Sequence, residues 1–232
     1  MQSTRFLFGA PHDGLIQFTL GEEFMNSQLL SFFQTHYSPA RIALVGANDI
    51  AGWLVRNGQF KITPDKKPSK WSHVFLIGDK RDDGRADGCI YIFESDIDVG
   101  VVEWQLINGP QESRLVKWCN DHIEHACVLG MNLTTDEQKS VVRKALELGY
   151  DDKMKYPVAE LVGTFWAILS NKLSKKNIFD DKYAVQCATF VRMCYQAIGK
   201  DILTGSSTDL SNTSPEKIYQ SQVFTFRQEW HK

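Results

Sequence analysis

The sequence has no apolar run long enough to span a membrane, and it has no secretory signal or nucleotide-binding motif. Its most apolar stretch, residues 158–169, contains Glu160 and is shorter than the about 20 residues that a bilayer requires. No Gly-Lys-Ser/Thr phosphate loop, dinucleotide glycine fingerprint or Gly-x-Ser-x-Gly elbow occurs. Phe6-Leu-Phe-Gly-Ala10 is too short for the apolar core of a signal peptide. We therefore expect a protein that is cytoplasmic as synthesised, with export only by a signal-independent route.

The chain also has little net charge and no paired-cysteine framework. Its 26 Lys and Arg residues against 28 Asp and Glu give a net charge of −2, which gives no indication of a nucleic-acid partner. Five cysteines, an odd number, suit a reducing compartment and free thiols. The basic segment of residues 61–70 is expected to be a solvated loop. A chain of 232 residues with 43% hydrophobic content is long enough for one domain with a substantial core.

Cys187 is a candidate nucleophile because a helix is expected to begin there. Apolar or small side chains recur with the spacing of one helix face at Cys187, Phe190, Val191, Cys194 and Ile198, and Gly199 is a helix stop. A thiol in a first helical turn feels the positive end of the helix dipole, which favours the thiolate. Free backbone N–H groups in that turn can also bind an oxyanion. The alternative is a buried structural cysteine, which is the role we expect for Cys194.

His73 and Glu94 are candidates for the base and for the group that orients it. Residues 71–78 and 89–94 are rich in β-branched and aromatic residues and predict two strands, and the polar residues 79–88 between them predict a hairpin connection. A symmetric connection pairs His73 directly with Glu94, and their Cβ atoms would then lie about 4.5–5.5 Å apart. A slip of one residue would place the two side chains on opposite faces. The alternative is a structural histidine in a hydrophobic strand.

These residues occur in an order that resembles the circularly permuted papain-like hydrolases of the NlpC-type superfamily, in particular the YiiX/YaeF-like proteins. Lecithin retinol acyltransferase and its relatives are more distant members. The resemblance covers residues 44–220, and in it the cysteine follows the histidine. It rests on five short matches: Gly46-Ala-Asn-Asp49-Ile50, Ser72-His73-Val74, Ile92-Phe-Glu94-Ser95, Cys187 and Thr213-Ser-Pro215-Glu216.

The resemblance implies an α+β fold, in which an antiparallel sheet or barrel packs on helices and the catalytic cysteine lies at a helix N-terminus. It implies an N-terminal extension, residues 1–43, packed on a catalytic domain, residues 44–232, with a helical insertion at about 108–180. Cys187 would attack an acyl carbon, His73 would pair with the thiolate, and Glu94 would fix the ring tautomer. The Cys187 N–H and the side chains of Gln186, Trp71 and Tyr183 are expected at the oxyanion and substrate site.

The implied function is that of a cysteine hydrolase that cleaves an amide bond through an acyl-enzyme, without a cofactor or metal. The expected substrate is a cell-wall (peptidoglycan) peptide, and the expected partners are this substrate and, after export, a secretion machinery or a cognate inhibitor protein. Two alternatives remain open. One is a lipid acyl hydrolase or acyltransferase that uses the same triad, and the other is a catalytically silent binding module with the same cleft.

The remaining segments give coarser predictions. Cys119, His122, His125 and Cys127 lie within nine residues, but a helix would spread them around its axis, so we expect no zinc site. Strands are predicted at 14–20, once or twice within 41–55, and at about 99–107. Helices are predicted at 22–36, 111–128, 135–148 and 157–173.

Overall fold

The computed structural model describes residues 25–82, 89–99, 106–150, 182–203, 205 and 213–232, and it has a mixed α+β fold. The described chain forms a six-stranded sheet with the order β4-β3-β2-β1-β5-β6, and its neighbouring strands are antiparallel. The elements are α1 (Ser27–Thr35), β1 (Ile42–Ala47), α2 (Ile50–Gly58), β2 (His73–Lys80), β3 (Ile90–Val99), β4 (Leu106–Arg114), the 3₁₀-helix η1 (Leu115–Trp118), β5 (Ile123–Gly130), α3 (Thr135–Gly149), α5 (Lys182–Gln196), α6 (Pro215–Gln220) and β6 (Phe226–His231).

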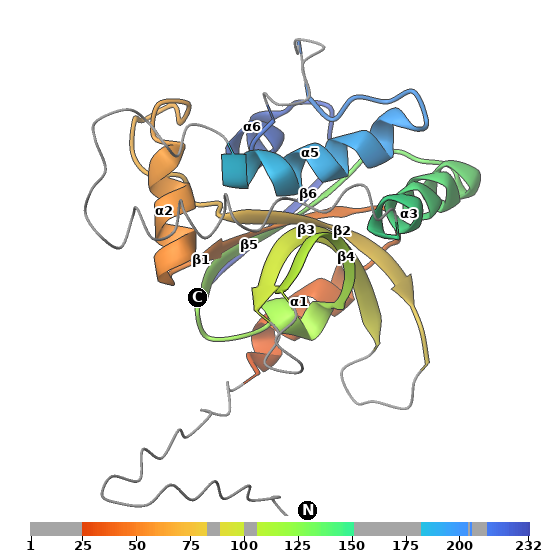
Figure 1. Cartoon of the computed structure of the whole chain (residues 1–232), viewed down its shortest axis with the longest axis horizontal. Coiled ribbons are helices and arrows are strands. Elements are labelled where there is room, and N and C mark those ends of the chain that lie inside the picture. Colours follow the sequence, from red (N-terminus) through yellow and green to blue (C-terminus); the bar gives the residue numbers. More distant parts are fainter. Residues whose placement is uncertain (1–24, 83–88, 100–105, 151–181, 204, 206–212) are drawn as a thin grey trace, which may run out of the picture.

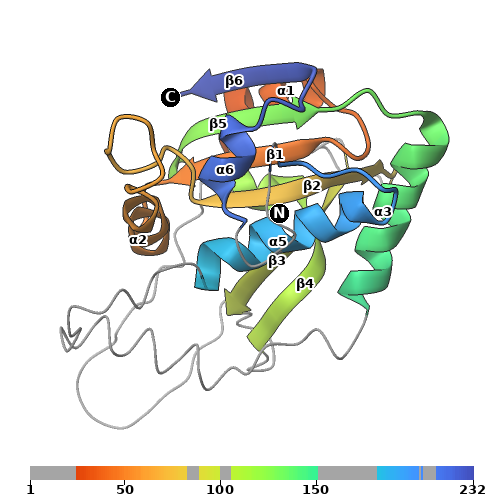
Figure 2. The same cartoon turned by 90° about the horizontal axis from the view of Figure 1, so that it is seen from above.

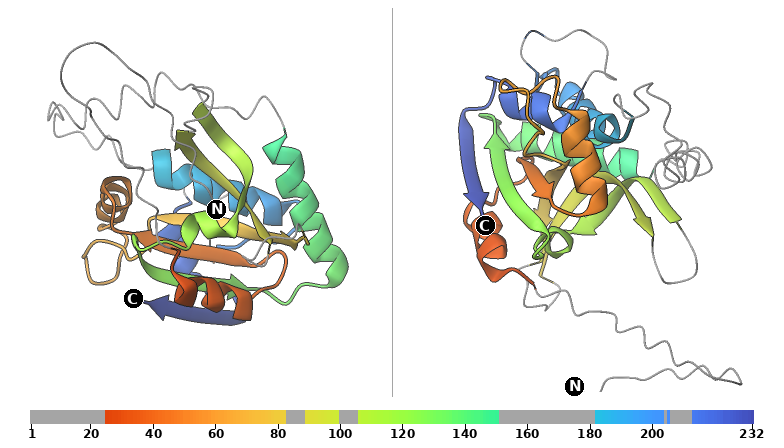
Figure 3. Two further views of the ribbon diagram at one scale, coloured as in Figure 1. Left: turned by 90° about the horizontal axis from the view of Figure 1, so that it is seen from below. Right: turned by 90° about the vertical axis from the view of Figure 1, so that its left-hand side faces the viewer.

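Helices cover both faces of the sheet, and each face has its own hydrophobic core. Helices α3, α5 and α6 pack on one face, while α1 packs on the other (Figures 1 and 2). Alternation along the strands divides the side chains between the two cores. On β2, Val74 and Leu76 face α5, whereas Phe75 and Ile77 face α1. Helix α2 lies at the end of the sheet, next to the start of α5 (Figure 3).

The helix over residues 135–148 is confirmed, and its start follows from local chemistry. Thr134 and Glu137 form a capping box, in which each side chain accepts a hydrogen bond from the other residue's backbone N–H. The helix predicted at 22–36 is shorter among the described residues, because Asn26 caps it and α1 begins at Ser27. Four inward side chains are expected on this helix: Phe24 lies outside the described residues, and Leu29, Leu30 and Phe33 are buried.

The helix predicted over residues 111–128 is wrong, since this segment forms the end of β4, the 3₁₀-helix η1 and most of β5. The third strand of the predicted meander is present, but it spans Leu106–Arg114 instead of about 99–107. Within residues 41–55, one predicted strand is β1 and the rest is helix α2, which Asp49 caps by accepting from the Gly52 N–H at 2.6 Å. The described part of the expected helical insertion is therefore largely sheet, apart from α3.

The β2–β3 hairpin is present, but its register differs from the symmetric one by two residues. Leu76 pairs with Phe93 and Ile77 with Ile92, and the pairing shifts between Ile77 and Lys80. The net offset from the symmetric register is therefore an even number of residues. Because side chains alternate with a period of two, this shift keeps each residue on its predicted face.

Several predictions fall outside the described residues, among them the strand at 14–20 and the helix at 157–173. The boundary predicted between residues 43 and 44 lies inside β1, so the described residues on both sides of it share one sheet. No helix within the described ranges is long and apolar enough to cross a membrane.

Candidate functional site

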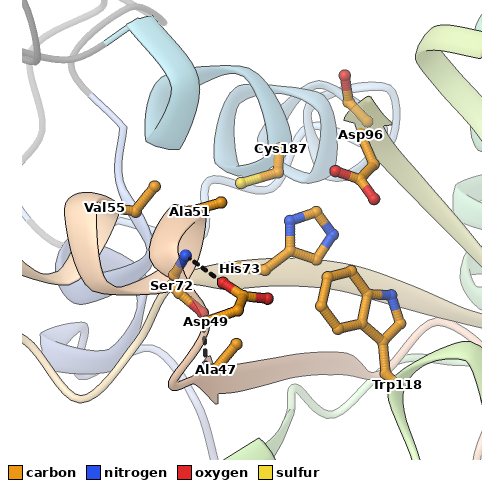
Figure 4. A pocket seen from close by; sticks show the side chains of 11 residues that line it. Ala47, Asp49, Ala51, Val55, Ser72, His73, Asp96, Trp118 and Cys187 are labelled. Atoms are coloured by element: carbon orange, nitrogen blue, oxygen red, sulfur yellow. Dashed lines mark hydrogen bonds between the residues drawn. The ribbon is translucent and has the colours of Figure 1, made fainter. Parts of the chain in front are cut away.

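A cavity of about 180 Å³ opens where β2 and β3 meet the α2 and α5 helices. His73, Ser95, Asp96, Trp118 and Cys187 contribute to its lining, together with the first turns of α2. In Figure 4, Cys187 lies on one side of the His73 ring and the Trp118 indole lies on the other side. Residues that are far apart in the sequence thus meet at one small, partly apolar cavity.

The His73 ring is held in place from several directions. Its Nε2 lies 3.0 Å from Glu94 Oε2, and its plane stacks on Trp118 with the ring centroids 4.5 Å apart and 19° between the planes. Because Nε2 faces Glu94, Nδ1 is the ring nitrogen left for Cys187. The predicted contact between His73 and Glu94 is therefore present, although the two residues are not directly opposed in the sheet.

The environment of His73 favours the imidazolium. Burial by itself lowers the pKa of His73, but the charge and hydrogen bond of Cys187, the hydrogen bond to Glu94 and the charge of Asp96 outweigh it. Together they raise the pKa of His73 from 6.5 to about 10. A protonated ring between a sulfur and a carboxylate is the arrangement of an imidazolium–thiolate pair with an orienting group.

Glu94 is fully buried and its carboxylate is surrounded by donors. Oε2 accepts from Trp118 Nε1 at 2.7 Å as well as from His73, and Oε1 accepts from Lys117 Nζ at 3.0 Å. Burial raises the pKa of Glu94, but the hydrogen bond and charge of His73, followed by the charge of Lys117, lower it below its usual range. Glu94 is thus a fixed anion behind the imidazole.

Lys117 links the two acidic residues of β3. Its ammonium group lies 2.8 Å from Asp96 Oδ2 and 3.0 Å from Glu94 Oε1. Burial lowers the pKa of Lys117, but the charges of Glu94 and Asp96 outweigh this effect and raise it. Asp96 lines the cavity next to His73, so its charge also supports protonation of the ring.

Cys187 lines the cavity, but it does not lie at the helix N-terminus. Helix α5 begins at Lys182, so Cys187 is its sixth residue. Only the first four N–H groups of a helix lack an intrahelical partner, and the dipole effect decays within the first turn. The Cys187 N–H, which was expected to donate to the oxyanion, therefore lies beyond the free N–H groups of α5. The predicted apolar face of this helix is confirmed, because Cys187, Phe190, Val191 and Cys194 are buried in one core.

Of the other expected substrate-site residues, Trp71 is placed elsewhere. It is 1% exposed, packs against Tyr219 with ring centroids 4.9 Å apart, and is not among the cavity-lining residues. The side chains of Gln186 and Tyr183 lie outside the described part of the chain, although their backbone belongs to α5.

The cysteines and histidines of residues 119–127 do not converge. Cys119 is buried in the core under α1, whereas Cys127 is buried in the core under α5, so the sheet separates the two thiols. Over the described ranges, no group of three or more His, Cys, Asp or Glu side chains is arranged to hold a metal ion.

Lys117 and Trp118 both contact Glu94, and neither was predicted from the sequence. They follow β4 in the 3₁₀-helix η1, where a long helix was predicted. The sequence nevertheless contains an indication of this role, because Lys117 and Trp118 are adjacent and both carry hydrogen-bond donors that can bind a carboxylate. Asp96 was missed because the second strand was expected to end at Glu94.

Comparison with solved structures finds distant structural likeness. No protein-family model matches the sequence, and no curated protein matches it significantly. The structure is similar to the crystal structure of metalloprotein yiiX from Escherichia coli O157:H7, of the DUF1105 group. The sequence identity is 14%, the match covers 84% of this chain and 97% of that chain, and the TM-score is 0.48.

Proposed function

We propose that the protein is a cysteine hydrolase of the permuted papain-like type, which cleaves an amide bond with Cys187, His73 and Glu94. The observation that carries the proposal is that His73 interacts with the Cys187 thiol and, through Nε2, with the buried, ionised Glu94. The order histidine, glutamate, cysteine along the chain agrees with the resemblance described above.

The chemistry follows from the two nitrogens of His73. The Cys187 thiolate attacks the acyl carbon, and the carbonyl oxygen becomes an oxyanion. When the C–N bond breaks, Nδ1–H protonates the leaving amine, and a thioester remains on Cys187. The neutral imidazole then removes a proton from water, and the resulting hydroxide attacks the thioester. The C–S bond breaks, the acid product leaves, and the thiolate–imidazolium pair is regenerated. Glu94 accepts from Nε2–H throughout and keeps Nδ1 directed at the sulfur.

Four charged side chains of alternating sign lie in a row, which we call the charge row: His73, Glu94, Lys117 and Asp96. The imidazolium faces Glu94, Glu94 faces Lys117, and Lys117 faces Asp96. Each buried charge in this row has a partner within 3.0 Å, which offsets the cost of removing it from water. Titratable groups with strongly perturbed pKa values and specific charge partners cluster at functional sites.

The substrate class we propose is a short peptide amide of the cell-wall type. The cavity is smaller than the about 300–1,000 Å³ that drug-sized ligands occupy, and this suits one small acyl residue at a time. The peptide assignment itself comes from the resemblance.

The test is incubation of the protein with purified muropeptides, with new amines and shortened peptides detected by mass spectrometry. We expect amine release by the wild type and none by C187A. The matched control is C194A, which removes the other thiol of the same helix and should retain release. Release by C187A equal to wild type would refute the proposal, and a fatty-acyl thioester on Cys187 without amine release would favour lipid acyl chemistry instead.

A further inference from the structure

The proposed reaction requires a hydrogen-bond donor for the oxyanion, and helix α5 does not supply one at Cys187. The Cys187 N–H lies beyond the four free N–H groups of the helix, as described above. Acyl transfer without a preorganised donor forfeits what is usually its largest catalytic contribution. Another group that lines the cavity must therefore face the acyl oxygen.

Ser95 lies on the face of β3 from which Cys187 approaches. Phe93, two residues earlier, packs in the same core as Cys187 and Ala188, and side chains on a strand alternate with a period of two. Ser95 therefore shares the α5 side of the sheet, whereas Glu94 faces His73 from the other side. Ser95 also lines the cavity that Cys187 lines.

The Ser95 hydroxyl is buried and has no hydrogen-bond partner among the described residues. The residue is 5% exposed, and its Oγ is one of the few buried side-chain atoms that lack a partner there. Buried polar groups are nearly always paired, so an unpaired hydroxyl that lines a candidate site points to a ligand.

The other neutral donors near the cavity are already engaged. Ser72 Oγ accepts from the Ala47 N–H at 2.9 Å and donates to the Val45 carbonyl at 3.2 Å. The Gly52 N–H donates to Asp49 at 2.6 Å. These groups hold the β1–α2 connection and are not free to bind a substrate oxygen.

We propose that the Ser95 hydroxyl is the oxyanion donor of this site: its Oγ–H donates to the acyl oxygen when Cys187 attacks. This assignment rests on the proposed hydrolase function. In this assignment the Ser95 hydroxyl contacts the reacting acyl group, and it forms its hydrogen bond only when a substrate is bound. Because the hydroxyl is a neutral donor, it stabilises the oxyanion without altering the charge row behind His73.

The experiment compares two reactions of Cys187 that differ in one respect. Acylation by p-nitrophenyl acetate passes through an oxyanion, whereas alkylation by iodoacetamide displaces iodide without forming one. Both second-order rate constants are measured at Cys187 by peptide mapping, for the wild type, S95A and S95T, with S140A on α3 as the serine-to-alanine control. Circular dichroism and the melting temperature report folding.

We expect S95A to lower the acylation rate constant about 10²-fold while alkylation stays within about twofold of wild type. S95T restores the hydroxyl and should recover most of the acylation rate, and S140A should leave both rates unchanged. The melting temperature of S95A should equal or exceed that of wild type, because an unpaired buried hydroxyl is removed.

The outcomes separate this assignment from the function on which it rests. If wild-type Cys187 is acylated and S95A is acylated equally fast, the assignment of Ser95 is wrong and the hydrolase proposal stands. If wild-type Cys187 reacts with neither reagent, the hydrolase proposal fails, and the Ser95 assignment fails with it.

Discussion

Replacement of Glu94 by glutamine removes the negative charge behind His73 and should lower the pKa of the imidazole. Nε2 and Oε2 lie 3.0 Å apart, and the two delocalised charges are centred about 4 Å apart. At an effective dielectric constant of about 20, that separation corresponds to roughly 4 kcal/mol. One pKa unit equals about 1.4 kcal/mol, so the expected fall is about 3 units. From a pKa of about 10 in the wild type, the E94Q imidazole should titrate near 7.

The assay is an NMR titration of the histidine ring protons, in which the H73Q variant assigns the His73 signal. The surface variant E147Q on α3 is the matched control, and it should leave the His73 titration unchanged. The cost of breaking a buried charge pair is about 3–5 kcal/mol, so circular dichroism must first confirm that E94Q is folded. A His73 midpoint that falls by less than one unit, or rises, would refute the electrostatic reasoning.

Three further predictions concern stability and are measured by urea unfolding. W118F keeps a ring over His73 but loses the indole donor to Glu94, and it should cost about 1.5–3 kcal/mol, whereas W53F at an exposed position should cost almost nothing. The lowered pKa of Glu94 contributes stability that is present above pH 4.5 and is lost as the pH falls towards its lowered folded value. The wild type should therefore lose stability below pH 4.5 more steeply than E94Q, and parallel acid curves would contradict this. G46A should lower the free energy of unfolding by about 1–3 kcal/mol, because the added Cβ would lie 2.0 Å from the Lys70 carbonyl oxygen. An unchanged free energy of unfolding would show that the backbone moves to accommodate the methyl group at no cost.

The sequence predicted the central hairpin and the contact between His73 and Glu94, although the predicted register was wrong. The prediction depended only on which face each side chain occupies, and an error of two residues leaves the faces unchanged. An error of one residue would have removed Glu94 from His73. Local pattern therefore predicts the face of a strand more securely than its exact pairing.

The segment 111–128 shows where local pattern fails. Leu115, Cys119, Ile123 and Ala126 are apolar at spacings of four, four and three, which is typical of a helix. All four are buried in the core under α1, but a strand end, a 3₁₀-helix and a new strand place them there. The pairing of β4 with β3 and of β5 with β1 outweighs the helical propensity of this segment. The β5–β1 pairing depends on residues that are distant in the sequence.

The start of helix α5 was misplaced for a different reason. The apolar face from Cys187 onwards is correct, but periodicity shows where a helix has a buried face and does not show where its exposed first turn begins. The consequence is chemical, because it removes the backbone donor expected at Cys187. It also directs attention to Ser95, for which the sequence pattern predicted no role.

The account depends most directly on a thiolate at Cys187 that is maintained by protonated His73. Thiolates absorb near 240 nm, so the difference spectrum between the wild type and C187A at pH 7 measures this ion pair in the resting protein. We expect an absorbance that corresponds to one thiolate in the wild type and its loss in H73Q. Identical spectra for the wild type and C187A at pH 7 would contradict the account.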